Sequence, residues 1–339
     1  MMKSLLQRKR VGEILAQARK QRVLVIGDVM LDQFIWGSVS RISPEAPVPV
    51  LDFQSENYMP GGGANVARNL TAWNIHTSAY SVIGRDHAGD QLEEQLRNWG
   101  VHCSGLIRSA KRATGLKTRI VAQRQQIVRV DREHKDLLGD SLTTKLIARI
   151  EKALKPDVAA VVLCDYGKGV VTQALLDRLA ELCRDRGIWL SMDPKPVRAL
   201  RLHGLSLMTP NRKEAFALAQ VTETPGPKDP LKDEALLDVV RTLMKRCKPA
   251  MMLVTLGEHG MLLCGRKGKP FHIPTIAQEV YDVSGAGDTA IAAFTLAVAG
   301  GASPVEAATI ANHAAGVVVG KVGTAITTTD ELLATFPKA

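Results

Sequence analysis

A glycine-rich turn near the end of the chain places the strongest constraint on its fold. The turn, GAGD at residues 285–288, follows an extended-looking stretch at 279–283 and precedes an apolar run at 290–299. This pattern predicts a strand, a tight turn and a helix. Glycines lack a Cβ and let the backbone approach a ligand closely, and the first amides of a helix are free to bind an anion. The segment is therefore typical of a phosphate cradle.

Asp288, the last residue of this turn, has two interpretations. A carboxylate repels phosphate, so its presence is explained if it accepts a proton from an attacking hydroxyl while the amides hold the phosphoryl group. An aspartate in a strand-to-helix turn can equally serve as a helix cap. The turn by itself favours neither interpretation, so the rest of the chain has to decide.

The composition is that of a globular protein of 339 residues, enough for one large domain or two ordinary ones. Aromatic residues make up only 4%, which argues against a stacking platform for single-stranded nucleic acid. The five cysteines are scattered without a CxxC pair, which indicates small buried side chains in a reducing compartment. The sequence contains no apolar run of membrane-spanning length and no signal peptide, so we expect a cytoplasmic protein without a membrane partner.

The net charge of +10 is concentrated at the N-terminus. Residues 1–22 contain seven Lys and Arg against one Glu, a balance of +6. A basic segment can bind nucleic acid or a membrane, but the apolar residues within it favour an amphipathic first helix with a solvated basic face. We expect a basic helical leader at 1–22 and a single domain at 23–339. Nucleic acid is not an expected partner, because no recognition motif is present.

Short apolar strands alternate with helices through most of this domain. Such repetition implies a doubly wound, mostly parallel sheet with helices on both faces, an α/β fold. Two segments depart from the pattern: residues 33–58 are interrupted by prolines, and residues 114–131 alternate between polar and apolar side chains. We expect these two insertions to form a small β lid outside the main sheet.

Polar residues follow several of the predicted strands. Because ligands bind outside the carboxyl ends of parallel strands, these residues are expected to converge on one rim of the sheet. Asp28 ends the strand at 23–28, and Asn65 follows a run of glycines and offers both donors and acceptors to a polyol. Each residue alone can be explained as a cap or a turn residue. The other candidates for this rim are Asp165, Asp193, Lys195, Asn211 and Glu214.

With these residues placed, the chain resembles the ribokinase (PfkB-type) family of carbohydrate kinases over about residues 22–335. The resemblance rests on GGGAN at 61–65, NRKE at 211–214 and DVSGAGDT at 282–289. It implies a ribokinase-like fold and phosphorylation of a sugar hydroxyl by ATP with Mg²⁺.

Within the family, the stretches 27–32, 40–50 and 278–282 are similar to the kinases of D-glycero-β-D-manno-heptose 7-phosphate. These enzymes phosphorylate the C1 hydroxyl on the way to ADP-heptose for lipopolysaccharide core. Because the chain ends at Ala339, we expect the stand-alone form of that kinase rather than a fusion to a nucleotidyltransferase.

The resemblance assigns roles to individual positions. It implies that Asp288 is the catalytic base and that the amides of Gly285, Ala286 and Gly287 form the anion hole. It implies that the sugar contacts Asp28, Asp32, Gly62, Gly63 and Asn65. It implies that ATP and a hydrated Mg²⁺ lie beside Lys195, Asn211, Glu214, Thr255, Gly257 and Asn312, with Glu214 reaching the metal through water.

The lid leaves several questions open. Lys117 and Arg129 are candidates for the 7-phosphate of the sugar, although both are equally well explained as the solvated face of a hairpin. The exposed face of the lid is also expected to form a homodimer. Two other functions stay open: a kinase of another sugar phosphate or nucleoside, and a sensor that binds a sugar phosphate without turnover. A sensor needs no base, so Asp288 argues against it.

Overall fold

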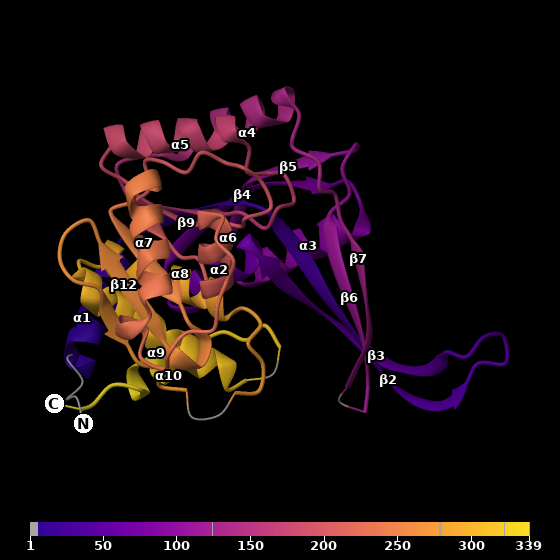
Figure 1. The fold of residues 1–339 in the computed structure, drawn as a ribbon. Coiled ribbons are helices and arrows are strands. Elements are labelled where there is room, and N and C mark those ends of the chain that lie inside the picture. The colour runs from indigo at the N-terminus through magenta and orange to yellow at the C-terminus, as the bar shows by residue number, and fades with distance from the viewer. Residues whose placement is uncertain (1–5, 124, 278–279, 322, 339) are drawn as a thin grey trace.

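The structure is a computed structural model that describes residues 6–123, 125–277, 280–321 and 323–338. These residues form an α/β body and a second, smaller sheet that extends away from it (Figure 1). The helices are α1 (Arg8–Ala18), α2 (Gly63–Ala72), α3 (His87–Asn98), α4 (Asp140–Ala153), α5 (Gln173–Asp185), α6 (Arg212–Ala219), α7 (Glu234–Cys247), α8 (Ala286–Ala299), α9 (Pro304–Val319) and α10 (Thr329–Ala334).

The main sheet is mostly parallel. Its nine strands are β1 (Arg22–Gly27), β4 (His76–Gly84), β5 (His102–Ser109), β8 (Val158–Cys164), β9 (Trp189–Asp193), β10 (Leu207–Met208), β11 (Met251–Thr255), β12 (Met261–Gly265) and β13 (Phe271–Ile273). Their spatial order is β13-β12-β11-β10-β9-β8-β1-β4-β5. The two antiparallel pairings of this sheet lie at one edge, where β12 pairs with β11 and with β13. The predicted doubly wound α/β sheet is confirmed.

Strand β1 shows why the sheet is covered on both faces. Val23 and Val25 belong to a core shared with α1, α2, α3, α8, α9 and α10, whereas Leu24 and Ile26 belong to a core shared with α4, α5, α6 and α7. Side chains alternate between the faces of a strand, so a strand in the middle of such a sheet is apolar throughout. This packing leaves the carboxyl ends of the strands as the open rim.

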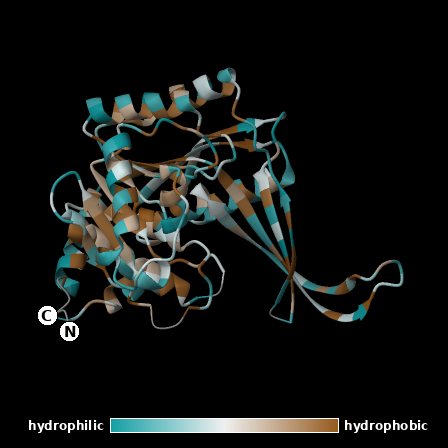
Figure 2. Ribbon diagram, viewed as in Figure 1, coloured by the Kyte–Doolittle hydropathy of each residue, from teal (hydrophilic) through white to brown (hydrophobic). Residues whose placement is uncertain are grey.

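The predicted β lid is also confirmed. It consists of β2 (Val29–Ile42), β3 (Pro49–Gly62), β6 (Gly115–Ala122) and β7 (Gln125–Arg132), in the order β3-β2-β6-β7. Pro44 and Pro47 lie in the connection between β2 and β3, where a missing amide donor breaks no ladder bond. Hydrophobic residues continue along the lid strands away from the body (Figure 2), and every residue of β7 is exposed.

The segment before the glycine turn corrects one prediction. Residues 280–285 form a loop and a turn instead of a strand, and residues 278 and 279 lie outside the described part of the chain. The amides of Tyr281 and Asp282 donate to the carbonyl of Val319 at the end of α9. The Asp282 carboxylate accepts from the amides of Ser284 and Gly323 at 2.8 and 3.1 Å. Because these contacts use the backbone donors, the segment needs no neighbouring strand.

The N-terminal helix packs on the body. The apolar side of α1 is buried in the core beside α8, and Arg10 pairs with Glu306 of α9 at 2.8 Å. Of the basic residues in α1, Lys9 is exposed, whereas Arg8 and Arg10 are partly buried. No helix in the described ranges is long and apolar enough to cross a membrane. All five cysteines are buried free thiols, as expected.

Candidate active site

The glycine turn forms the start of α8. Gly285 is the N-cap and has a left-handed backbone with φ 80°, which favours glycine. No side chain caps this helix end, so the interpretation of Asp288 as a helix cap is wrong. The 14-residue helix directs the positive end of its dipole and its first amides at the rim, although the amide of Ala286 also donates to the carbonyl of Val283 at 3.3 Å. An anion is therefore stabilised here.

Asp288 is held from two elements far away in sequence. Asn65 Nδ2 on α2 donates to Asp288 Oδ2 at 2.8 Å, and the hydroxyl of Tyr166, in the loop after β8, donates to Oδ1. Burial raises the pKa of the Asp288 carboxyl, and these two hydrogen bonds oppose the rise. A half-buried carboxylate with a raised pKa at a rim suits proton transfer.

Helices α2 and α8 are joined next to Asp288 by a polar network. Asn69 Nδ2 donates to the backbone carbonyl of Asn65 at 2.9 Å, and Thr289 Oγ1 donates to Asn69 Oδ1 at 3.1 Å. Asn65, Asn69 and Thr289 are all fully buried. Satisfied buried networks fix their members rigidly, so the orientation of Asn65 toward Asp288 is set by the packing of two helices.

Asp28 has a structural task in addition to its predicted contact with the sugar. Its carboxylate accepts from the amides of Tyr166, Lys168 and Val170 at 2.8–2.9 Å. These three bonds shape the loop after β8 and place the Tyr166 ring below the rim. The Asp28 side chain is almost completely buried, and a buried carboxylate with three amide donors is well compensated.

The glycines at 61–63 allow close packing between the lid and the body. A Cβ at Gly61 would lie 2.4 Å from Asp32 Oδ2, and a Cβ at Gly62, which has φ 59°, would lie 2.8 Å from Met30. A Cβ at Gly63 would lie 3.1 Å from the carbonyl oxygen of Asp28. Asp32 pairs with Arg119 of β6 at 2.6 Å. The predicted sugar residues thus converge where the lid meets the body.

Lys195 lies on the side of the rim where the sequence predicts the nucleotide, and it pairs with two carboxylates. Its ammonium contacts Asp193 Oδ2 at 2.9 Å and Glu214 Oε1 at 2.6 Å. Burial lowers the pKa of Lys195, but the two carboxylates raise it more, so the side chain stays charged. Asn211 and Glu214 form the capping box of α6, with each side chain accepting from the other residue's amide at 2.9 Å.

The remaining predicted nucleotide residues lie on neighbouring elements. Thr255 ends β11 and forms a bridge to Asn211, and Gly257 turns the chain with φ 58°. Asn312, on α9, donates to the carbonyl of Pro274 at 2.8 Å. The adjacent His313 contacts Thr335 and stacks on Phe336, which makes it a helix-packing residue.

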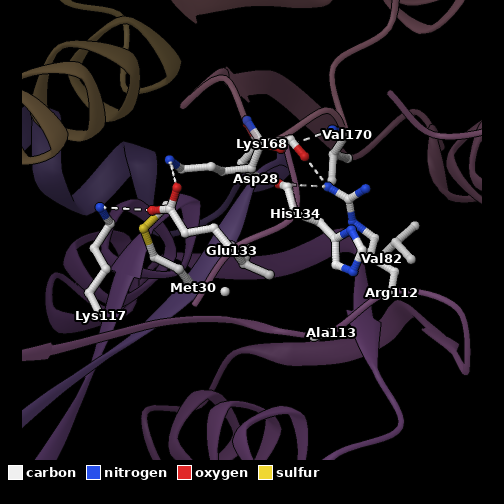
Figure 3. Close-up of a pocket in the computed structure, with 12 residues that line it drawn as sticks. Asp28, Met30, Val82, Arg112, Ala113, Lys117, Glu133, His134, Lys168 and Val170 are labelled. Carbon is white, nitrogen blue, oxygen red and sulfur yellow. Dashed lines mark hydrogen bonds and ion pairs between the residues drawn. The ribbon is translucent and has the colours of Figure 1, made fainter. Parts of the chain in front are cut away.

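A polar pocket lies between the lid and the loop after β8 (Figure 3). Glu133 lies at its centre and pairs with Lys117 at 3.0 Å and with Lys168. Asp28 and Arg112 also line it. Arg129 is not among its lining residues; this side chain pairs with Asp131 at 2.8 Å on the exposed strand β7. The two predicted phosphate residues therefore share Asp131, which Lys117 contacts at 3.5 Å, but only Lys117 lines the pocket.

The sequence interpretation missed several residues of the site and its pocket: Tyr166, Lys168, Arg119, Glu133 and Arg112. Tyr166 and Lys168 belong to DYGKG at 165–169, directly after β8, where a glycine-rich stretch at a strand end was a usable signal. Arg119 looked like one more basic residue of a hairpin. Only the pairing of β2 with β6 brings it to Asp32.

Comparison with known proteins agrees with this arrangement. The profile of the pfkB family carbohydrate kinases matches residues 20–331. The chain is 41% identical to the Bifunctional protein HldE of Geobacter metallireducens over 97% of its own length, and it spans 65% of that protein. Among solved structures, phosphofructokinase-2 from Escherichia coli in complex with potassium has a TM-score of 0.75 at 20% identity, covering 94% of this chain and 98% of that one. Arabidopsis thaliana ribokinase complexed with ribose and ATP has a TM-score of 0.71 at 20% identity, covering 94% and 99%. At these identities the likeness shows a common ribokinase-like fold.

Proposed function

The chain belongs to the pfkB family of carbohydrate kinases, and we propose that it transfers a phosphoryl group from ATP to the C1 hydroxyl of heptose 7-phosphate. The observation that carries the proposal is the position of Asp288, a half-buried carboxylate beside the first amides of α8. A base and an anion cradle at one point are what transfer to a hydroxyl requires. The product would be heptose 1,7-bisphosphate, a precursor of ADP-heptose for lipopolysaccharide core.

In this mechanism, Asp288 accepts the proton of the sugar hydroxyl as that oxygen attacks the γ-phosphorus. The amides of Gly285, Ala286 and Gly287 stabilise the charge on the transferring group. One such donor lowers the barrier by about 3–4 kcal/mol, and a general base contributes roughly 10²–10⁴ in rate. Closure of the lid over the sugar would exclude water and limit wasteful hydrolysis of ATP.

The chemistry of the nucleotide side fits a hydrated divalent cation such as Mg²⁺. Asp193 and Glu214 offer carboxylate oxygens, the ligand type that Mg²⁺ prefers, but both already contact Lys195. Among the described residues, no group of three or more His, Cys, Asp or Glu side chains is gathered for a metal. We therefore infer that Glu214 reaches the cation through water. When bound, the cation would neutralise the phosphates of ATP.

The pocket in Figure 3 supports a phosphorylated sugar as substrate. Lys117 and Lys168 both pair with Glu133, and Lys117 also contacts Asp131 at 3.5 Å. A dianionic phosphate would compete with Glu133 for these ammonium groups. Asp28 lines the same pocket and connects it, through the loop of Tyr166, to Asp288. Arg129 lies farther out on β7 and would reach the phosphate only by leaving Asp131.

A coupled ADP-release assay with heptose 7-phosphate, fructose 6-phosphate and ribose as acceptors tests the proposal. We expect heptose 7-phosphate to give a kcat/KM at least tenfold above the others. Lys168→Ala should raise the KM for heptose 7-phosphate about tenfold or more, since a hydrogen bond to a charged group is lost, and should leave the KM for ATP unchanged. Lys145→Ala, on the exposed side of α4, is the matched control.

The outcomes separate the open alternatives. A higher kcat/KM for fructose 6-phosphate or ribose would show a kinase with another substrate. Tight binding of heptose 7-phosphate without ADP release would indicate a sensor. An unchanged KM for heptose 7-phosphate in Lys168→Ala would contradict the proposal that Lys117 and Lys168 bind the phosphate.

We further propose that two copies associate through the lid. Its far end exposes large apolar side chains, Ile42 and Phe53 among them, at 61% and 63% of their surface. Sedimentation velocity should show a particle of twice the chain mass, and Phe53→Ser should shift it toward the monomer. Val197→Ser, equally exposed but outside the lid, should not. A monomeric wild-type protein would contradict the proposal.

A further inference from the structure

Tyr166 contacts each part of the site. Its amide donates to Asp28 at 2.9 Å, and its hydroxyl donates to Asp288 Oδ1. Its ring lies below the Lys195 ammonium, 5.6 Å from the ring centroid. A phenylalanine would satisfy the packing of this ring equally well. The hydroxyl therefore has a more specific task than filling space.

We propose that Tyr166 is a positioning residue for the base, in which the hydroxyl fixes one carboxylate oxygen of Asp288 and keeps the carboxylate ionised. The inference rests on the proposed role of Asp288. With Asn65 on Oδ2 and Tyr166 on Oδ1, the carboxylate plane is held from both sides. Each oxygen keeps a further lone pair, so the acceptor hydroxyl can approach without displacing either donor.

The Tyr166 hydroxyl is needed because the other groups around Asp288 have opposing effects on the protonation of its carboxyl. Asp32 on β2 favours the protonated form of Asp288, as burial does, whereas Lys195 favours the carboxylate. Arg68 on α2 also interacts with the charge of Asp288; burial lowers its pKa to about 10, so it stays charged near neutral pH, and its guanidinium donates to the carbonyl of Thr324. Asp193, the last residue of β9, and Cys164 on β8 are further titratable groups that interact with Asp288. Lys195 is already engaged by two carboxylates. A neutral donor in direct contact is therefore the most local means of favouring the carboxylate.

The ionisation of Tyr166 itself does not compete with this role. Burial and the neighbouring Asp288 charge raise the pKa of Tyr166 well above its ordinary value. The phenol thus stays protonated and acts as a donor over the whole range in which Asp288 titrates. The hydrogen bond has only one direction, from Tyr166 to Asp288.

Tyr166→Phe removes this donor and keeps the ring. The hydrogen bond lowers the pKa of Asp288, so its loss should raise that pKa. We expect a rise of about one pH unit, which corresponds to the free energy of one hydrogen bond to a charged group. The acid limb of the kcat/KM profile for the sugar should move up by the same amount. At pH values below the acid limbs of both the wild-type and the variant profile, protonation of the base limits the rate, and the variant should be about tenfold less active than wild type. At alkaline pH the difference should be smaller. The KM for ATP should not change.

A second readout does not depend on activity. Titration of the aspartate carboxyl carbons by ¹³C NMR follows Asp288 directly, with its signal assigned by loss in Asp288→Asn. We expect the same upward shift in Tyr166→Phe. Tyr80→Phe, which removes the hydroxyl of a buried tyrosine on β4, is the matched control and should change neither measurement. Thermal unfolding verifies that both variants are folded.

Each outcome bears on a different claim. If Asp288→Asn keeps its activity, the base assignment fails. If that variant is inactive but Tyr166→Phe leaves both the acid limb and the Asp288 titration unmoved, only the role of Tyr166 is overturned. A rise in activity would overturn it too, because the hydroxyl would then be an obstacle to the substrate. A loss that is equal at every pH would indicate a purely structural effect and would also contradict the inference.

Discussion

Asp288→Asn is expected to reduce kcat at least a hundredfold, since a positioned base contributes roughly 10²–10⁴ in rate. Asparagine has the same shape and can still accept one hydrogen bond from Asn65 or Tyr166, so the turn should keep its conformation. It cannot take a proton from the sugar hydroxyl. The coupled ADP-release assay measures kcat, and calorimetric titration should show that ATP binds within about threefold of wild type.

Asp330→Asn, at the exposed start of α10, is the matched control for this substitution and should behave as wild type. A value of kcat within threefold of wild type for Asp288→Asn would remove Asp288 from the role of base. In that case transfer would depend on the amide cradle and the nucleotide side alone. Normal kcat with weakened ATP binding would instead place Asp288 on the nucleotide.

Much of the fold was predictable because its signals are local. Apolar strands followed by helices identified the parallel sheet, and the prolines at 44 and 47 with the alternating hairpin identified the lid. Residues at strand ends, such as Asp28 and Lys195, were predictable as rim residues for the same reason. The less regular elements were missed. Strand β5 contains Gly105, which weakens its pattern, and α10 has only six residues.

The functional contacts were less predictable because they join distant segments. Whether Asp288 was a cap or a base depended on Asn65, which is 223 residues away and meets it only because α2 packs on α8. The pocket around Glu133 required a lid strand and the loop after β8 to come together. The stretch at 279–283 was predicted as a strand because it looks extended and precedes the glycine turn. The amides of Tyr281, Asp282 and Ser284 instead donate to the end of α9 and to the Asp282 carboxylate.

Gly285→Ala is expected to impair catalysis through a neighbouring side chain. Gly285 has φ 80°, where an L-residue is strained by about 1–2 kcal/mol. The new Cβ would also lie 2.8 Å from Asn65 Nδ2, closer than real Cβ atoms come to other atoms. Asn65 is fully buried and cannot swing into solvent, so relief of the clash would weaken its hydrogen bond to Asp288. We expect kcat to fall about tenfold or more, since the loss of a single oriented donor has effects of that size.

Gly301→Ala separates the effect of backbone strain from the effect of the clash with Asn65. Gly301 has the same φ of 80°, but a Cβ there would have no atom within 4 Å. This variant should lose about 1–2 kcal/mol of stability in urea unfolding and keep its kcat. Gly285→Ala should lose at least as much stability and also lose activity, because only at Gly285 does the strained residue touch a partner of the base. Equal, near wild-type kcat in both variants would show that Asn65 can shift freely, and its role in holding Asp288 would then have to be abandoned.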